Sequence, residues 1–89
     1  MAHLSAAREG LGKDIHLMVD AGTVWNENID SARVRLPHLK NVYAYWLEEP
    51  FANLALDAYR QLAASLPAVP ISACYGCSTL VNAKAMMYY

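Results

Sequence analysis

Three short apolar runs recur at an almost constant interval along this chain of 89 residues. The runs end at Asp20, Glu48 and Tyr75, which lie 28 and 27 residues apart. Each run has the length of a buried strand, and the segments between them have the apolar spacing of amphipathic helices. An interval of this size fits one strand–helix unit of a parallel array. The sequence therefore predicts an α/β fold built from parallel βα units.

The expected order of elements is α-β-α-β-α-β-α. We expect Asn26 and Asn53 to cap the second and third helices, with Pro37 ending the second, and Ser78 or Thr79 to open the last. The first helix ends at glycine, which suits a helix C-terminus. The three strands are expected at about residues 15–20, 42–48 and 69–75.

Continuous apolar strands alternating with amphipathic helices are typical of a parallel sheet covered by helices. Three strands cannot close a barrel, and a complete βα barrel has about 250 residues. Residues 1–89 are therefore expected to form part of a larger domain, a partial (β/α) TIM-type barrel with about three strands and four helices. Because both outer strands of such a piece keep unpaired edges, we expect the isolated chain to self-associate.

Composition excludes several classes of protein. Hydrophobic residues make up 56% of the chain and charged residues 17%, which argues against disorder. The formal net charge of −1 and the lack of basic clusters predict no nucleic-acid or anionic membrane partner. The uncharged stretch 61–83 contains prolines and polar side chains, so we expect no transmembrane helix. Two cysteines without a secretory signal indicate a reducing, cytoplasmic setting.

Carboxylates follow two of the three predicted strands. Asp20 and Glu48 come directly after apolar runs, and the ends of parallel strands meet on one face of the sheet. Two neighbouring carboxylates repel each other, and a hard divalent cation such as Mg²⁺ relieves that repulsion. The alternative is that Asp20 caps a turn and Glu48 is solvated. The spacing alone leaves both interpretations open.

Longer motifs surround these acids and resemble one protein family. The segments are LMVDAG at 17–22, YWLEEPF at 45–51, an LxxYRxLA-like stretch at 56–63 and VPIxA at 69–73. Together they are similar to the mandelate racemase and muconate-lactonizing branch of the enolase superfamily. Members of that branch bind one Mg²⁺ through three acidic residues at the ends of successive strands of a C-terminal barrel. The resemblance implies Asp20 as the first ligand, Glu48 as the second, and Glu49 as a second-shell or loop carboxylate.

The position of the third ligand departs from the family pattern. Tyr75 stands where the resemblance implies an acid, and a phenol with an ordinary pKa of about 10 is a poor Mg²⁺ ligand at neutral pH. Gly22 also departs from the pattern, because many relatives have asparagine there. The resemblance therefore implies a Mg²⁺ site with two carboxylate ligands, weakened by the missing third carboxylate.

The resemblance implies an activity as well: Mg²⁺-dependent proton abstraction next to a carboxylate, of the acid-sugar dehydratase or racemase type. The metal holds a small carboxylic-acid substrate, and a base removes the α-proton to give a stabilised enediolate. The family's lysine pair belongs on a strand before Met1, and its second base beyond Tyr89. Lys13, His16 and His38 do not match those positions. We therefore expect the isolated chain to lack the catalytic bases and to be inactive alone.

Two function classes outside this family remain open. The chain could be a non-catalytic α/β fragment or a piece that assembles with other chains. Alternatively, Cys74 and Cys77 form a C-x-x-C pair between a strand and a helix, the setting of a thioredoxin-like redox pair. Only twelve residues follow Cys77, so the later elements of that fold are not expected.

The remaining candidate side chains have structural interpretations. We expect the aromatic run of Tyr43, Tyr45 and Trp46 to be buried in the second strand. His16 is expected to pack in the middle of the first strand. Lys13 is expected in a solvated turn, and His38 in a loop.

Overall fold

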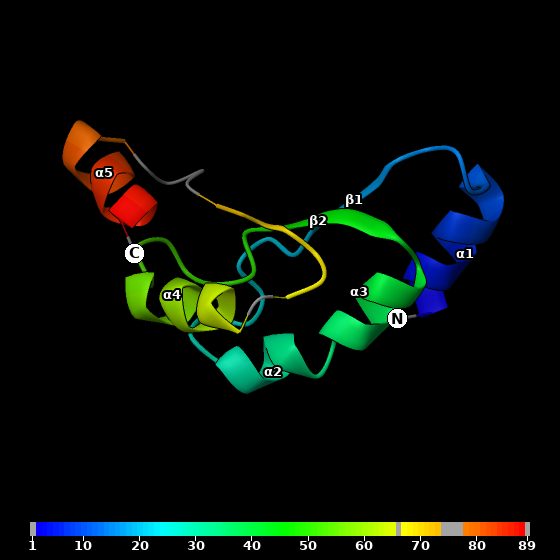
Figure 1. Cartoon of the computed structure of the whole chain (residues 1–89), viewed down its shortest axis with the longest axis horizontal. Coiled ribbons are helices and arrows are strands. Elements are labelled where there is room, and N and C mark those ends of the chain that lie inside the picture. The colour runs from blue at the N-terminus through cyan, green and yellow to red at the C-terminus, as the bar shows by residue number, and fades with distance from the viewer. Residues whose placement is uncertain (1, 66, 74–77, 89) are drawn as a thin grey trace.

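A computed structural model of the chain describes residues 2–65, 67–73 and 78–88. Within these ranges helices alternate with parallel strands, which confirms the predicted fold class (Figure 1). None of the helices in these ranges is long and apolar enough to cross a membrane. The elements are α1 (Ala2–Leu11), β1 (Leu17–Asp20), α2 (Ile29–Arg33), α3 (Leu36–Asn41), β2 (Ala44–Glu48), α4 (Leu56–Ala64), β3 (Ile71–Ser72) and α5 (Leu80–Tyr88).

The described strands form one parallel sheet in the order β1-β2-β3. An irregularity after Leu17 shifts the pairing by one residue, and the register then runs to Asp20 opposite Glu48. Glu48 in turn lies opposite Ser72 of β3. The strands are shorter than predicted at their amino ends, and the predicted end of the third strand, at residues 74–75, lies outside the described ranges.

Helices α2, α3 and α4 lie on the same side of the strands (Figure 1). Leu47 of β2 is fully buried there against Leu39 of α3, and Val19 of β1 packs on the same cluster. A second cluster joins α4 to α2 and to the segment after β2. Because side chains alternate along a strand, Met18 and Asp20 face the other way, and both are exposed.

The second predicted helix is two short helices, so the predicted cap and stop are both wrong. Asn28, not Asn26, caps α2, and its side-chain oxygen accepts a hydrogen bond from the Ser31 N–H at 3.1 Å. Pro37 lies in the first turn of α3, where a missing N–H costs no hydrogen bond. His38 therefore lies in a helix instead of the expected loop.

The start of α4 also differs from the prediction. Asn53 does not cap this helix, whose first residue is Leu56. Between them Leu54 has a φ of 64°, so the chain makes a left-handed turn before the helix begins. The amphipathic spacing expected of the segments between strands is confirmed here, because Tyr59 and Leu62 are both buried on one face of the helix.

The boundaries of the two terminal helices agree with the prediction. Gly12 has a φ of 80°, and its N–H donates to the Arg8 carbonyl at 3.0 Å, which ends α1. The Thr79 hydroxyl oxygen accepts a hydrogen bond from the Asn82 N–H at 3.1 Å, one turn into the last helix.

The expectation that the aromatic run is buried is wrong for Tyr43 and Tyr45, whereas Trp46 in the middle of β2 is half-buried. Tyr43 is 78% exposed and Tyr45 is 49% exposed. Tyr43 precedes the strand, in a turn with a φ of 54°. His16 lies outside β1, is exposed, and stacks on Tyr45 with ring centroids 4.3 Å apart. Lys13 is exposed in the turn before β1, as expected.

Arg8 of α1 joins three segments near the amino ends of β1 and β2. Its guanidinium donates to four backbone carbonyls: Val42 (2.7 Å), Gly12 (2.7 Å), Ile15 (2.7 Å) and Tyr43 (3.0 Å). These carbonyls belong to the loop before β1 and to the turn before β2. The side chain therefore holds the starts of the two strands beside each other, a role the sequence pattern did not indicate.

Replacing this arginine should lower stability. Arg8→Ala leaves four carbonyls without their charged donor, and we expect the free energy of unfolding to fall by about 1–3 kcal/mol. Arg8→Lys should recover only part of the loss, because an ammonium group cannot reproduce the planar fork of donors. Urea unfolding followed by circular dichroism measures both. The matched control is Arg33→Ala, which removes an exposed ion pair with Asp30 and should cost less than about 0.5 kcal/mol. Equal losses for Arg8 and Arg33 would contradict this role.

Candidate functional site

The two acids predicted as metal ligands lie opposite each other at the carboxyl ends of β1 and β2. Asp20 and Glu48 are register partners, one residue beyond the partners Val19 and Leu47. Since Leu47 is buried against the helices, Glu48 and its partner lie on the opposite face of the sheet. Neighbouring strands are about 4.8 Å apart, so the two carboxylates leave the backbone side by side. The structure thus brings this pair together, and metal binding by it stays a prediction.

A hollow of about 320 Å³ lies at these strand ends. It is rich in oxygen atoms from carboxylates, a hydroxyl and an amide. Its lining residues are Asp20, Gly22, Thr23, Glu48, Glu49 and Asn53. The Asp20 Oδ1 atom accepts a hydrogen bond from the Gly22 N–H at 2.9 Å, so the turn-capping role considered for this residue is present. Asp20 therefore caps the turn at Gly22 and also lines the hollow.

Backbone hydrogen bonds continue the pairing of β1 with β2 beyond both strands. They run from Ala21 N–H to Glu48 O (2.8 Å), from Thr23 N–H to Glu49 O (2.6 Å) and from Trp25 N–H to Pro50 O (3.2 Å). On the other side, the Glu49 N–H donates to the Ser72 carbonyl at 2.8 Å. The backbone around the acids is therefore tied to both neighbouring strands, which gives the hollow a rigid base.

Glu49 is placed differently from Glu48. It is only 6% exposed, has a φ of 51°, and its Oε2 atom lies 3.3 Å from the hydroxyl of Tyr59 on α4. The same hydroxyl lies 3.1 Å from the Phe51 carbonyl and accepts from the Phe51 N–H at 3.4 Å. The Tyr59 and Phe51 rings meet edge to face, with centroids 5.2 Å apart. Glu49 thus lies beside the acid pair and is linked to the helix layer.

Burial is the main reason that the pKa of Tyr59 is raised to about 12. A hydrogen bond with the Phe51 backbone acts in the opposite direction, and the nearby Glu49 charge raises the pKa further. A phenol is protonated at neutral pH in any case, and the raised pKa keeps the Tyr59 proton in place further into alkali. Apolar periodicity indicates only that Tyr59 lies on the buried face of a helix, and it does not reveal this hydrogen-bonding role. A buried tyrosine needs a hydrogen-bond partner, which was the available signal.

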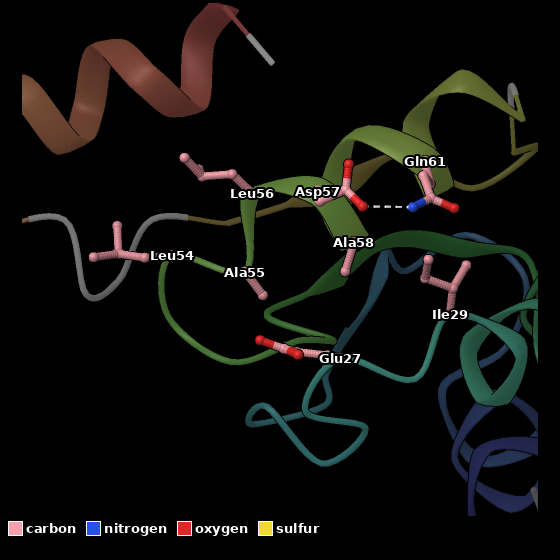
Figure 2. A pocket seen from close by; sticks show the side chains of 8 residues that line it. All are labelled: Glu27, Ile29, Leu54, Ala55, Leu56, Asp57, Ala58 and Gln61. Atoms are coloured by element: carbon pink, nitrogen blue, oxygen red, sulfur yellow. Dashed lines mark hydrogen bonds between the residues drawn. The ribbon is translucent and has the colours of Figure 1, made fainter.

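A second hollow, of about 440 Å³, lies on the helix side between α4 and the start of α2 (Figure 2). It shares none of its lining residues with the hollow at the strand ends. Its acids are Glu27 and Asp57. Asp57 pairs with Arg60 and accepts a hydrogen bond from Gln61 at 2.6 Å. Both contacts lower the pKa of Asp57, and the contact with Arg60 has the larger effect. Because Asp57 is held by its own helix, this hollow is the weaker candidate.

Other predicted site residues lie outside the described part of the chain. These are Tyr75, the degenerate third-ligand position, and the thiol pair Cys74 and Cys77. In the ranges that the structure does describe, no group of three or more histidine, cysteine, aspartate or glutamate side chains is arranged to hold a metal ion. The opposed pair of Asp20 and Glu48 is therefore the feature on which a metal hypothesis depends.

Comparison with known proteins agrees with the fold and with the motifs. A family model described as enolase C-terminal domain-like matches residues 1–88, and the chain therefore belongs to that family. The crystal structure of a predicted mandelate racemase from Rhodobacter sphaeroides shares 40% sequence identity with this chain at a TM-score of 0.88. That match covers 94% of this chain and 22% of the racemase chain. No curated protein matches. The resemblance to the mandelate racemase and muconate-lactonizing branch of the enolase superfamily is confirmed.

The raised pKa of Tyr59 predicts a loss of stability in alkali. The unfolded chain releases this phenolic proton at about pH 10, whereas the folded chain holds it until about pH 12. The contribution is therefore complete below pH 10 and is lost as the pH rises toward 12. Urea unfolding across this range should show a steeper loss for the unmodified chain than for Tyr59→Phe. Tyr43→Phe, which removes an exposed hydroxyl, should keep the steep loss. An unchanged slope in Tyr59→Phe would contradict the prediction.

Proposed function

We propose that this chain contributes Asp20 and Glu48 as carboxylate ligands to the Mg²⁺ site of a racemase or acid-sugar dehydratase. The observation that carries the proposal is the opposed placement of the two acids at the ends of neighbouring parallel strands. Membership of the enolase superfamily and the similarity to a predicted mandelate racemase support this class of activity. Since the chain spans 22% of that racemase, the activity and substrate of the whole enzyme belong to the proposal.

The chemistry of the donor atoms suits Mg²⁺. Magnesium prefers hard oxygen ligands and is usually held by one or two carboxylates together with water. The hollow offers the two opposed carboxylates, and Thr23 and Asn53 add a hydroxyl and an amide oxygen at its wall. Neither a thiol nor an imidazole lines it among the described residues, which disfavours zinc. A phenol at position 75 in place of a third acid would leave the binding weak.

A bound Mg²⁺ would hold the carboxylate of a small acid and stabilise the negative charge that develops when the α-proton leaves. Asp20 and Glu48 would hold the ion, and the hollow beside them would admit the substrate. The reaction also needs a positioned base. Lys13 and His16 precede β1, whereas Asp20 ends it, so the length of the strand separates them from the acids. Neither is placed to take a proton at this site.

A second candidate function, assembly with other chains, is favoured by exposed apolar and aromatic side chains on and beside the sheet. Met18 of β1 is 51% exposed, and Tyr43 and Tyr45 are exposed at the start of β2. Within the described sheet β1 and β3 each pair on one side only. Open strand edges beside exposed apolar side chains favour association between chains.

The metal proposal predicts a specific effect of removing either acid. Isothermal titration of the unmodified chain with Mg²⁺ should show weak binding, and Asp20→Asn or Glu48→Gln should weaken it at least about tenfold, because each removes one anionic oxygen ligand. The matched control is Glu27→Gln, an acid of the other hollow, which should leave the affinity unchanged. Equal affinities for all four proteins would contradict the proposed site, as would the failure of the unmodified chain to bind.

The assembly candidate predicts that the isolated chain self-associates. Light scattering after size exclusion should give a mass above that of the monomer, rising with protein concentration, and the dye ANS should bind to the exposed apolar face. Met18→Lys should reduce both signals, since it places a charge on that face. Lys13→Met, a change in an exposed turn, serves as the control for altered charge. A monomer at all concentrations that unfolds cooperatively would contradict this candidate.

A further inference from the structure

We propose that Tyr59 is a positioning residue that acts through Glu49 to hold Glu48 at the metal site. This inference rests on the function proposed above. Tyr59 lies on α4 in the helix layer, whereas Glu48 faces the opposite side of the sheet. The two are linked by the turn Glu49–Phe51, which leads from the end of β2 toward α4.

The Tyr59 hydroxyl contacts both ends of this turn. It lies 3.3 Å from the Glu49 Oε2 atom, 3.1 Å from the Phe51 carbonyl and 3.4 Å from the Phe51 N–H. A phenol has one proton, so it donates to the carboxylate or to the carbonyl while the N–H donates to it. All three residues are buried, where a hydrogen bond is expensive to lose. This one hydroxyl therefore bridges Glu49 and Phe51 and links the turn to α4.

The turn needs such support because its backbone is strained. Glu49 has a φ of 51°, a left-handed conformation that residues other than glycine and asparagine adopt only where their surroundings hold it. Its N–H and carbonyl are held by Ser72 and Thr23 on the neighbouring segments, and its carboxylate reaches Tyr59. Glu49 directly follows Glu48, so holding the Glu49 backbone in this conformation restrains the end of β2 from which the Glu48 side chain leaves the sheet.

The position of the Glu48 carboxylate matters because the Asp20 carboxylate repels it. A carboxylate opposite Asp20 moves away from its neighbour unless the backbone holds it in place. Groups that orient metal ligands without touching the metal typically change the affinity by 10- to 100-fold. The link from Tyr59 through Glu49 therefore affects the affinity of the site rather than the identity of its ligands.

Isothermal titration with Mg²⁺ tests this inference on the full chain. Tyr59→Phe keeps the ring packing against Phe51 and removes only the hydroxyl, and we expect about tenfold weaker binding. Tyr45→Phe removes the hydroxyl of an exposed tyrosine and should leave the affinity unchanged. The single variant Glu49→Ala is then compared with the double variant that carries Glu49→Ala and Tyr59→Phe. Because Tyr59 acts through Glu49, the effect of Tyr59→Phe should be largely lost there.

The outcomes separate the inference from the proposed function. If the unmodified chain binds Mg²⁺ and Tyr59→Phe binds equally well, the inference is overturned while the metal site stands. An equal loss in both backgrounds also overturns it, because Tyr59 would then act through the general stability of the fold. If the unmodified chain does not bind, the proposed function and the inference both fail.

A measurement on the unmodified chain covers the case in which Tyr59→Phe does not fold. Adding Mg²⁺ should shift the aromatic NMR resonances of Tyr59, which is linked to the site through Glu49, and leave those of the exposed Tyr43 unchanged. Binding without a shift at Tyr59 overturns the inference.

Discussion

The pairing of β2 with a parallel strand on each side is the constraint on which the other features depend. Leu47 of β2 is fully buried against the helices, so the strand cannot rotate without exposing it. A shift of the register by a single residue would turn every side chain of β2 to the opposite face. The burial of Leu47 therefore fixes the face on which Glu48 lies, and the pairing with β1 brings that face beside Asp20.

The two faces of the sheet carry different kinds of side chains. The face toward α2, α3 and α4 holds the apolar clusters, and the acids lie on the other face at the carboxyl ends of the strands. A polar site does not interrupt the core in this arrangement, and the core supplies the rigidity that the site needs. Two neighbouring strands, β1 and β2, are sufficient to place the acid pair side by side.

The periodic features of this fold are readable from the sequence, whereas the individual polar contacts are not. Apolar periodicity predicts the three strands, their parallel order and the placement of Asp20 and Glu48 at strand ends, because burial has a period that the sequence repeats. Periodicity fails at Pro37, because proline can either begin a helix or end one, and here it lies in the first turn of α3. It fails also at Tyr43 and Arg8, since their exposure and partners depend on which segments meet in space. The affinity of Asp20 and Glu48 for a metal is not readable from periodicity, because it depends on which groups complete the ligand set.

The left-handed conformation of Glu49 gives the two consecutive acids different surroundings: Glu48 lies on the site face and Glu49 reaches the helix layer. The two side chains are chemically identical, so their different surroundings come only from their positions in the chain. Insertions and deletions are therefore more damaging here than point changes. One extra residue between Leu47 and Glu48 would move Glu48 into the place that Glu49 occupies, although both acids would still be present. During the divergence of such domains, selection should preserve the length of this segment as well as the identity of its acids.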